Sequence, residues 1–327
     1  MKIVPRSLVR PIALAAALVL GAAACGAPDS EPSADGPSLP EPVEVEHRFD
    51  TTTVEAVPKR VVTLDLQWTD VMLSMGVEPV GYPADTAMPE SGVPWQDFSG
   101  DAESLSVADG LPIERIAALE PDLIVGTYTI PDRKSYRLLS RIAPTIASLD
   151  ERQVMPWADL VGIAGKVLDE PAAADEVVAS VQDEVEAAAA DMPQLKGRTF
   201  ALAQYVVGDK LYIVADEQDG SSTFFHDLGM RMYPQVKRRG EETGDARIGV
   251  STERSDLLRA DFVAFLVNGG DEGELGDIPG FDELPGTVAV LDYPTIVALN
   301  TPTPLSIPHA LEALRPHLAD VAGGADA

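Results

Sequence analysis

The stretch PAAADEVVASVQDEVEAAAA, residues 171–190, predicts one long helix in the middle of the chain. Its alanine and valine side chains recur every three or four residues and acidic side chains fill many other positions, which is typical of an amphipathic helix. Met192-Pro193 ends the pattern. At about 1.5 Å per residue the helix is roughly 30 Å long, enough to run along two domains and join them. We therefore interpret residues 156–193 as a connecting helical segment that also contains a shorter helix at 158–168.

Short apolar runs rich in β-branched residues alternate with helical patterns on both sides of this connector, which is typical of α/β architecture. Before the connector, the predicted strands are residues 61–64, 80–82, 123–125 and 145–147, and the predicted helices are residues 69–75, 113–119 and 133–142. After it, the predicted strands are residues 199–205, 211–214, 262–267 and 288–291, and the predicted helices are residues 223–228, 252–258 and 307–314. We therefore predict an N-terminal α/β lobe over residues 43–155 and a C-terminal α/β lobe over residues 194–327.

The two predicted lobes share a sequence pattern. The stretches IERIAALEPDLIVG (residues 113–126) and STERSDLLRADFVAFL (residues 251–266) each contain a helix with an early glutamate, a turn with an acidic residue and an apolar strand. The lobes therefore look like two copies of one plan. The predicted fold is α/β, with two Rossmann-like lobes joined by one long helix.

The N-terminus predicts export. Three basic residues lie within residues 1–10, an apolar run covers residues 12–24, and the only cysteine of the chain, Cys25, follows it. These features predict a signal peptide over residues 1–24, and the apolar run is too short to span a membrane. Cys25 resembles the acylated cysteine of a bacterial lipobox, although alanines replace the usual leucine, and ordinary cleavage to a soluble secreted protein with a free thiol is the alternative. Residues 25–42 predict a lipidated cysteine and a disordered tether, because they are rich in proline and acids.

The chain carries a net charge of −29. Such a charge excludes general binding to nucleic acid or to an anionic lipid surface, so we expect the lipid anchor alone to hold the protein at the outer face of the cytoplasmic membrane. Because no cysteine follows Cys25, the body can form no disulfide and depends on packing for its stability.

Three sequence features occur in a suggestive order: the stretch PKRVVTLDLQWTDVMLSMGVEPVGY (residues 58–82), the block E-x-I-x-A-L-x-P-D-L-I-V that starts at Glu114, and the connecting helix. In these features the chain resembles the iron-siderophore and cobalamin branch of the substrate-binding proteins of ABC importers, over nearly all of residues 43–318. The resemblance implies two lobes bridged by one rigid helix, with the ligand in the cleft between them. It also implies a protein without catalytic residues or a cofactor, which delivers its ligand to a permease dimer. We expect the binding protein itself to be a monomer.

The early glutamates of the two repeated stretches, Glu114 and Glu253, gain a role from this resemblance. In the family one glutamate of each lobe inserts among arginines of the permease dimer, and these two residues occupy the matching positions. Charge-assisted pairs between arginine and carboxylate give an interface its orientation and specificity. The alternative is that each glutamate only favours the positive end of its own helix.

A siderophore complex is bulky and partly apolar, so its site needs aromatic walls and a few polar or cationic groups. Open α/β sheets bind ligands at the loops that follow their strands. The aromatic candidates in or beside such loops, together with one nearby cation, are Trp68, Tyr82, Trp95, Tyr128 and Arg133 in the first lobe and Tyr205, Tyr212, Phe224 and Tyr293 in the second. Trp95 lies in a proline- and serine-rich loop, where core packing is least expected, whereas Trp68 and Tyr205 fit a core equally well. We expect Trp157 to pack at the lobe junction.

The charge of the chain also bears on the ligand. A ferric tris-catecholate is a trianion, whereas ferric tris-hydroxamates are close to neutral or cationic, and an acidic protein favours the latter. We therefore predict a ferric hydroxamate siderophore, with haem or cobalamin as the alternative ligand. The siderophore, not the protein, would coordinate the iron.

Other classes of function have weaker support in the sequence. The four histidines are scattered without the spacing of metal ligands, so we predict no metal site, although His226 beside Asp227 suits a haem ligand in a haem-binding relative. Ser221 and Ser222 lie close to His226 in the sequence, but no G-x-S-x-G motif supports a hydrolase. A surface adhesion or sensor module that has lost import is a third alternative.

Overall fold

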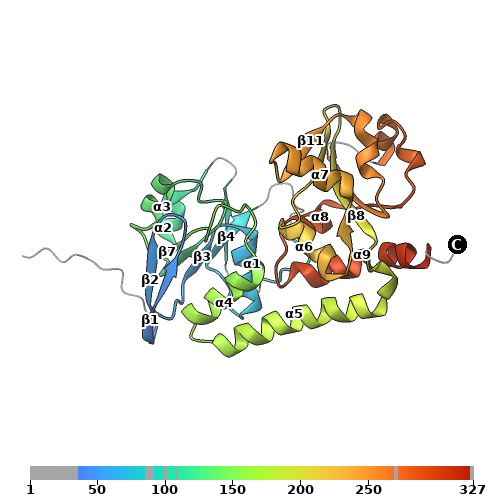
Figure 1. Ribbon diagram of the computed structural model, residues 1–327. Helices are drawn as coiled ribbons and strands as arrows, with labels where there is room; N and C mark the ends of the chain where they lie inside the picture. Colours follow the sequence, from blue (N-terminus) through green and yellow to red (C-terminus); the bar gives the residue numbers. More distant parts are fainter. Residues whose placement is uncertain are drawn as a thin grey trace, which may run out of the picture. The chain divides into compact units, whose positions relative to one another are not determined.

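The computed structural model describes residues 36–84, 92–98, 100, 102–107, 110–268 and 272–324. Residues Pro32–Ala327 belong to one compact unit. Within it the described chain forms a hairpin, two sheets with helices around them, and a long helix shared by both sheets (Figure 1). The predicted α/β fold is confirmed. The predicted signal peptide and Cys25 lie outside the described residues.

The first element is an antiparallel hairpin of β1 (Ser38–Glu46) and β2 (Thr51–Ala56). Strand β1 begins inside the stretch that the sequence predicted to be a tether up to residue 42, so that prediction is wrong at its C-terminal end. Pro40 and Pro42 obscured the strand, because proline cannot donate to a ladder of hydrogen bonds. Proline is tolerated at the edge of a sheet, and this sheet has only two strands.

The first large sheet has the order β5-β4-β3-β6-β7, and every pairing in it is parallel. Its strands are β3 (Val61–Thr63), β4 (Gly81–Ala84), β5 (Glu103–Ser106), β6 (Leu123–Val125) and β7 (Thr145–Ile146). Its helices are α1 (Leu66–Ser74), α2 (Ile113–Ala118) and α3 (Arg133–Leu139). The central strands β3 and β6 are completely buried, which explains their apolar sequences.

The second large sheet has the order β11-β9-β8-β12-β13, and β10 also pairs with β8. Its strands are β8 (Thr199–Val206), β9 (Leu211–Val214), β10 (Arg231–Met232), β11 (Arg247–Val250), β12 (Phe262–Asn268) and β13 (Thr287–Val290). Strands β10, β12 and β13 run parallel to β8, while β9 pairs with β8 and β11 in antiparallel fashion. The two lobes are therefore related in plan but not identical.

The helices of the second lobe are α6 (Gly220–Asp227), α7 (Pro234–Thr243), α8 (Tyr293–Asn300) and α9 (Ser306–Gly323), with short 3-10 helices η2 (Thr252–Leu258), η3 (Glu272–Asp277) and η4 (Phe281–Glu283). The repeated stretches of the sequence form corresponding units, α2 followed by β6 and η2 followed by β12. The second unit differs from the prediction, because η2 is a 3-10 helix interrupted at Arg254 rather than an α-helix.

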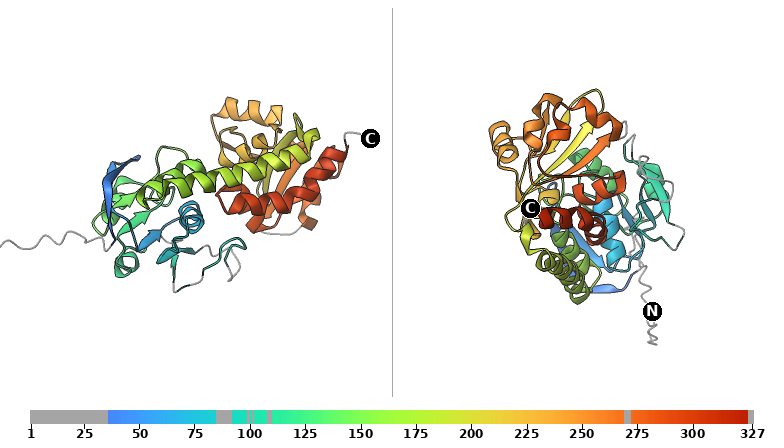
Figure 2. Two further views of the ribbon diagram at one scale, coloured as in Figure 1. Left: turned by 90° about the horizontal axis from the view of Figure 1, so that it is seen from below. Right: turned by 90° about the vertical axis from the view of Figure 1, so that its right-hand side faces the viewer.

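The connector consists of α4 (Trp157–Val167), α5 (Pro171–Asp191) and the short helix η1 (Pro193–Leu195). Near its start, α5 places Ala174 in the apolar core around β3 and β6. Farther along, Val181, Val185 and Ala188 pack in the core of the second sheet. One helix therefore belongs to two cores, and Figure 2 shows α5 running along both groups of elements.

No helix within the described ranges is both long and apolar enough to cross a membrane.

Candidate functional site

The carboxyl ends of β3 and β6 are joined by Asp65, which is buried. Its side chain caps α1 by accepting a hydrogen bond from the backbone nitrogen of Trp68 at 3.1 Å. It also accepts hydrogen bonds from the backbone nitrogen and the hydroxyl of Thr127, the latter at 3.0 Å. Burial raises the pKa of Asp65, although these hydrogen bonds oppose the rise. The loops after β3 and β6, where the sequence predicted ligand contacts, are thereby fixed to each other.

The start of α1 is also held by Gln67, whose side chain is completely buried. Its amide nitrogen donates to the backbone oxygens of Met155 at 2.8 Å and Pro302 at 3.4 Å. Its amide oxygen accepts from the backbone nitrogen of Met155 at 3.0 Å. Gln67 therefore ties α1 both to the segment before α4 and to the segment between α8 and α9.

One turn later, the buried carboxylate of Asp70 accepts three side-chain hydrogen bonds. The donors are the indole nitrogen of Trp95 at 2.8 Å, the amide of Gln96 at 2.5 Å and the hydroxyl of Thr303 at 2.5 Å. Burial raises the pKa of Asp70 to about 6, because these donors offset only part of the cost of removing the charge from water. Through these hydrogen bonds, Asp70 links residues 95–96 of the first lobe to the segment before α9.

The aromatic candidates of the first lobe lie in different environments. Trp68 is completely buried in the core of the first sheet and offers no surface to a ligand in this structure. Trp95 is half-buried and packs on His309 of α9, with ring centroids 5.0 Å apart. Tyr82 is half-buried and stacks on Phe98 at 4.2 Å, while Tyr128 is 45% exposed. Tyr82 on β4 and Tyr128 just after β6 are candidates of this lobe that keep accessible aromatic surface near the ends of the strands.

Arg133 is exposed at the first position of α3. It lies close enough to His47 to lower the pKa of that imidazole, whose pKa is lowered chiefly by burial. His47 belongs to the β1–β2 hairpin region and packs against Tyr136 of α3, with ring centroids 4.9 Å apart. Arg133 is therefore near the N-terminal hairpin.

The aromatic candidates of the second lobe also differ in their exposure to solvent. Tyr205 is buried in β8, with its hydroxyl 3.5 Å from the backbone nitrogen of Gly208, and Phe224 is buried in α6. Tyr212 on β9 is 36% exposed, and its hydroxyl donates to Asp209 at 3.4 Å. Tyr293 is half-buried at the first position of α8, directly after β13 and Leu291-Asp292. The proposed ligand role of the aromatic set stays a prediction, for which Tyr82, Tyr128 and Tyr293 have suitable positions.

Both candidate docking residues are accessible. Glu114 lies exposed in the first turn of α2, and Glu253 lies exposed in the first turn of η2, where the hydroxyl of Ser251 caps the helix. Their positions suit a contact with a partner and also suit the positive ends of their own helices.

The residues considered for other functions are engaged elsewhere. The hydroxyl of Ser221 donates to Asp219 and that of Ser222 to the backbone oxygen of Asp216, so neither recorded bond joins a serine to His226. Nδ1 of His226 lies 3.2 Å from the backbone oxygen of Met230, and its Nε2 is buried. Among the residues that the structure describes, no group of three or more potential metal ligands converges.

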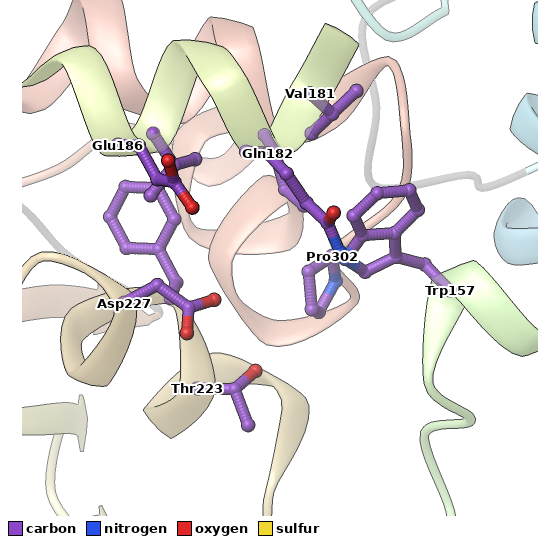
Figure 3. Close-up of a pocket in the computed structure, with 10 residues that line it drawn as sticks. Trp157, Val181, Gln182, Glu186, Thr223, Asp227 and Pro302 are labelled. Carbon is purple, nitrogen blue, oxygen red and sulfur yellow. The ribbon is translucent and has the colours of Figure 1, made fainter. Parts of the chain in front are cut away.

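Two cavities lie beside α5. One has a volume of about 310 Å³ and is lined by residues of α5, α6 and α9 together with Trp157 and Pro302 (Figure 3). The other is a more open groove of about 460 Å³, where Trp95 and His309 meet Glu184 of α5 and other residues of α9. Trp157, which the sequence placed at the lobe junction, lines the first cavity.

The chain is similar in sequence and fold to known proteins. The family described as periplasmic binding protein matches residues 61–254. The probable siderophore-binding lipoprotein YfiY of Bacillus subtilis is 26% identical over 181 residues, which span 54% of this chain and 54% of YfiY. The iron(3+)-hydroxamate-binding protein FhuD of Bacillus subtilis is 25% identical over 78% of this chain and 80% of FhuD. A solved periplasmic solute binding protein of Mycobacterium smegmatis is 27% identical, with a TM-score of 0.73 over 86% of this chain and 99% of its own.

Proposed function

Because this chain belongs to the periplasmic binding protein family, we propose that it captures a ferric siderophore outside the cytoplasmic membrane and delivers it to an ABC importer. The observation that carries this proposal is the pairing of two α/β sheets through the single helix α5, the arrangement expected of a binding protein with its ligand between two lobes. Relatives named as siderophore-binding and iron-hydroxamate-binding proteins support the ligand class.

The ferric hydroxamate class is the finer part of this proposal. A net charge of −29 repels a trianionic catecholate complex more strongly than a neutral or cationic hydroxamate complex. Tyr82, Tyr128 and Tyr293 supply aromatic surface near the carboxyl ends of strands without adding charge. The one histidine considered as a haem ligand, His226, has its Nε2 buried in this conformation, which does not support that role for it.

Intrinsic fluorescence tests the ligand class. We expect a ferric hydroxamate such as ferrichrome to quench the tryptophan fluorescence of the protein saturably. A ferric tris-catecholate should bind about tenfold more weakly or worse, which corresponds to about 1.4 kcal/mol. The iron-free hydroxamate, haem and cobalamin serve as comparisons in the same titration. A flat response to every compound would contradict siderophore capture, and equal binding of the catecholate would contradict the hydroxamate class.

We also propose that Cys25 carries a lipid that anchors the protein to the membrane. The relative YfiY is named a lipoprotein, and the cysteine follows a predicted export signal. Mass spectrometry of the mature N-terminus should find acylated Cys25 as the first residue, and Cys25→Ser should release the protein into the extracytoplasmic space. A mature N-terminus at another residue, without acylation, would show ordinary secretion instead.

The partner proposed for delivery is a permease dimer, which the binding protein approaches as a monomer. Glu114 and Glu253 are exposed and lie one on each lobe, so each can meet one half of a two-fold partner. Anchoring at the same membrane raises the effective concentration of the binding protein near that permease.

A further inference from the structure

The cavity of about 310 Å³ between α5 and α6, here called the α5–α6 cavity, has the volume of a small ligand pocket. Its floor is apolar and includes Val181, Val185 and Phe224, which are buried. Trp157 forms one wall, and Figure 3 shows its indole beside Pro302 and Gln182. The cavity therefore offers a molecule both apolar contact and an aromatic face.

Two carboxylates from different helices border the same space. Glu186 of α5 and Asp227 of α6 point toward each other across the cavity (Figure 3). No lysine or arginine is among the residues that line it, and no ion pair is recorded for either carboxylate within the described part of the chain. Both carboxylates keep solvent exposure, and the partial burial of Asp227 raises its pKa in spite of the neighbouring His226.

The lining selects a particular class of occupant. A cation would be attracted to both carboxylates and to the face of Trp157. The apolar floor favours a cation that carries hydrocarbon over a hydrated metal ion, and in the described ranges no set of three metal-ligating side chains converges here. The polar groups that remain, Gln182 and Thr223, can accept hydrogen bonds from an ammonium group.

We propose that the α5–α6 cavity binds a small organic cation with an apolar body, such as an alkyl- or arylammonium ion. Of the residues predicted to contact the siderophore, only Phe224 also lines this cavity. An occupant would touch the connecting helix, the second lobe and the junction residues Trp157 and Pro302 at once. Its binding would therefore stabilise the packing of α5 against the second lobe by mass action.

Benzylammonium, the protonated form of benzylamine at neutral pH, is a suitable probe, with benzyl alcohol as the uncharged comparison. Calorimetric titration of the purified protein at low ionic strength should show saturable binding of the cation and markedly weaker binding of the alcohol. The double variant Glu186→Gln/Asp227→Asn should bind the cation about tenfold more weakly, since two partly exposed charge contacts are lost. Ferrichrome quenching by the double variant should equal that of the wild type, which separates this site from the siderophore site.

Asp183→Asn is the matched control, because Asp183 is exposed on α5 but does not line the cavity. Its affinity for the cation should equal the wild-type value, and circular dichroism should show that all variants keep the fold. The proposal is overturned if benzyl alcohol binds as well as the cation, or if the cation does not saturate the protein. It is overturned equally if Asp183→Asn weakens binding as much as the double variant, because the effect would then reflect net charge alone.

Discussion

Transport of the bound siderophore is expected to fall about hundredfold or more when Glu114 and Glu253 are both changed to alanine, while siderophore affinity keeps its wild-type value. Both side chains are exposed, and they lie one on each lobe. Removing one member of a buried ion pair at an interface costs about 2–5 kcal/mol, so if both glutamates form such pairs with the permease, losing them would weaken docking at least hundredfold. Growth on a ferric hydroxamate as the sole iron source measures transport, and tryptophan quenching measures affinity.

A matched double variant separates docking from a general loss of surface charge. Glu176 and Glu312 are exposed on α5 and α9, so Glu176→Ala/Glu312→Ala removes the same charge from other surfaces. This control should transport normally. Docking is ruled out if the Glu114/Glu253 double variant supports normal growth. If growth falls only because thermal stability falls, the two glutamates instead act by stabilising the N-termini of their own helices.

The free energy of unfolding is expected to fall by about 3 kcal/mol through Asp70 as the pH rises from about 4 to above 6. The pKa of this carboxyl is about 6 in the folded protein and 3.8 ordinarily, so between these values the folded state holds a proton that the unfolded state has released. The stability that Asp70 contributes is fully present at pH values below its pKa in the unfolded state. It is lost as the pH rises through its pKa in the folded state. Urea denaturation across this pH range measures the effect.

Asp70→Asn should remove this pH dependence and make the protein more stable than the wild type above pH 6. The new amide oxygen can accept from Trp95 and Thr303, as Oδ2 does now. Its amide nitrogen would face Gln96, whose own side-chain amide can turn to present its oxygen. Asp70→Ala should instead destabilise the protein at every pH, because it leaves three donors without an acceptor. An unchanged difference between wild type and Asp70→Asn from pH 4 to 8 would disprove the assignment.

The fold was predictable where burial imposes periodicity. Strands β6 and β9 and the long helix α5 have the predicted bounds to within one residue, because their apolar residues face a core. Strand β5 was missed because its sequence ESLS buries one side chain only. Helix α7 was missed because it buries only Val236 and Gly240 and is otherwise polar. Helix α8 was also missed, although its start has a recognisable pattern: Asp292 caps it and Pro294 lies in its first turn.

The site was less predictable, because sequence position gives the neighbourhood of a side chain but not its exposure. Trp68 and Tyr205 lie beside strand ends as predicted, yet helix α1 and strand β8 direct them into the cores. The links made by Gln67 and Asp70 were missed for a different reason. Asp70 and Thr303 are 233 residues apart, and no local sequence pattern predicts a hydrogen bond between residues so far apart in the chain.

The amide of Gln67 bears on how quickly a ligand is captured and released. It holds the start of α1 against Met155 and Pro302 through buried hydrogen bonds, so separating these segments would leave polar groups unpaired. A site preorganised in this way uses little of the interaction energy of its ligand to rearrange the protein. We expect association at about 10⁵–10⁷ M⁻¹ s⁻¹, with siderophores distinguished by residence time. Prompt release would then depend on the importer, which must separate segments that stay hydrogen-bonded to each other when only the ligand is bound.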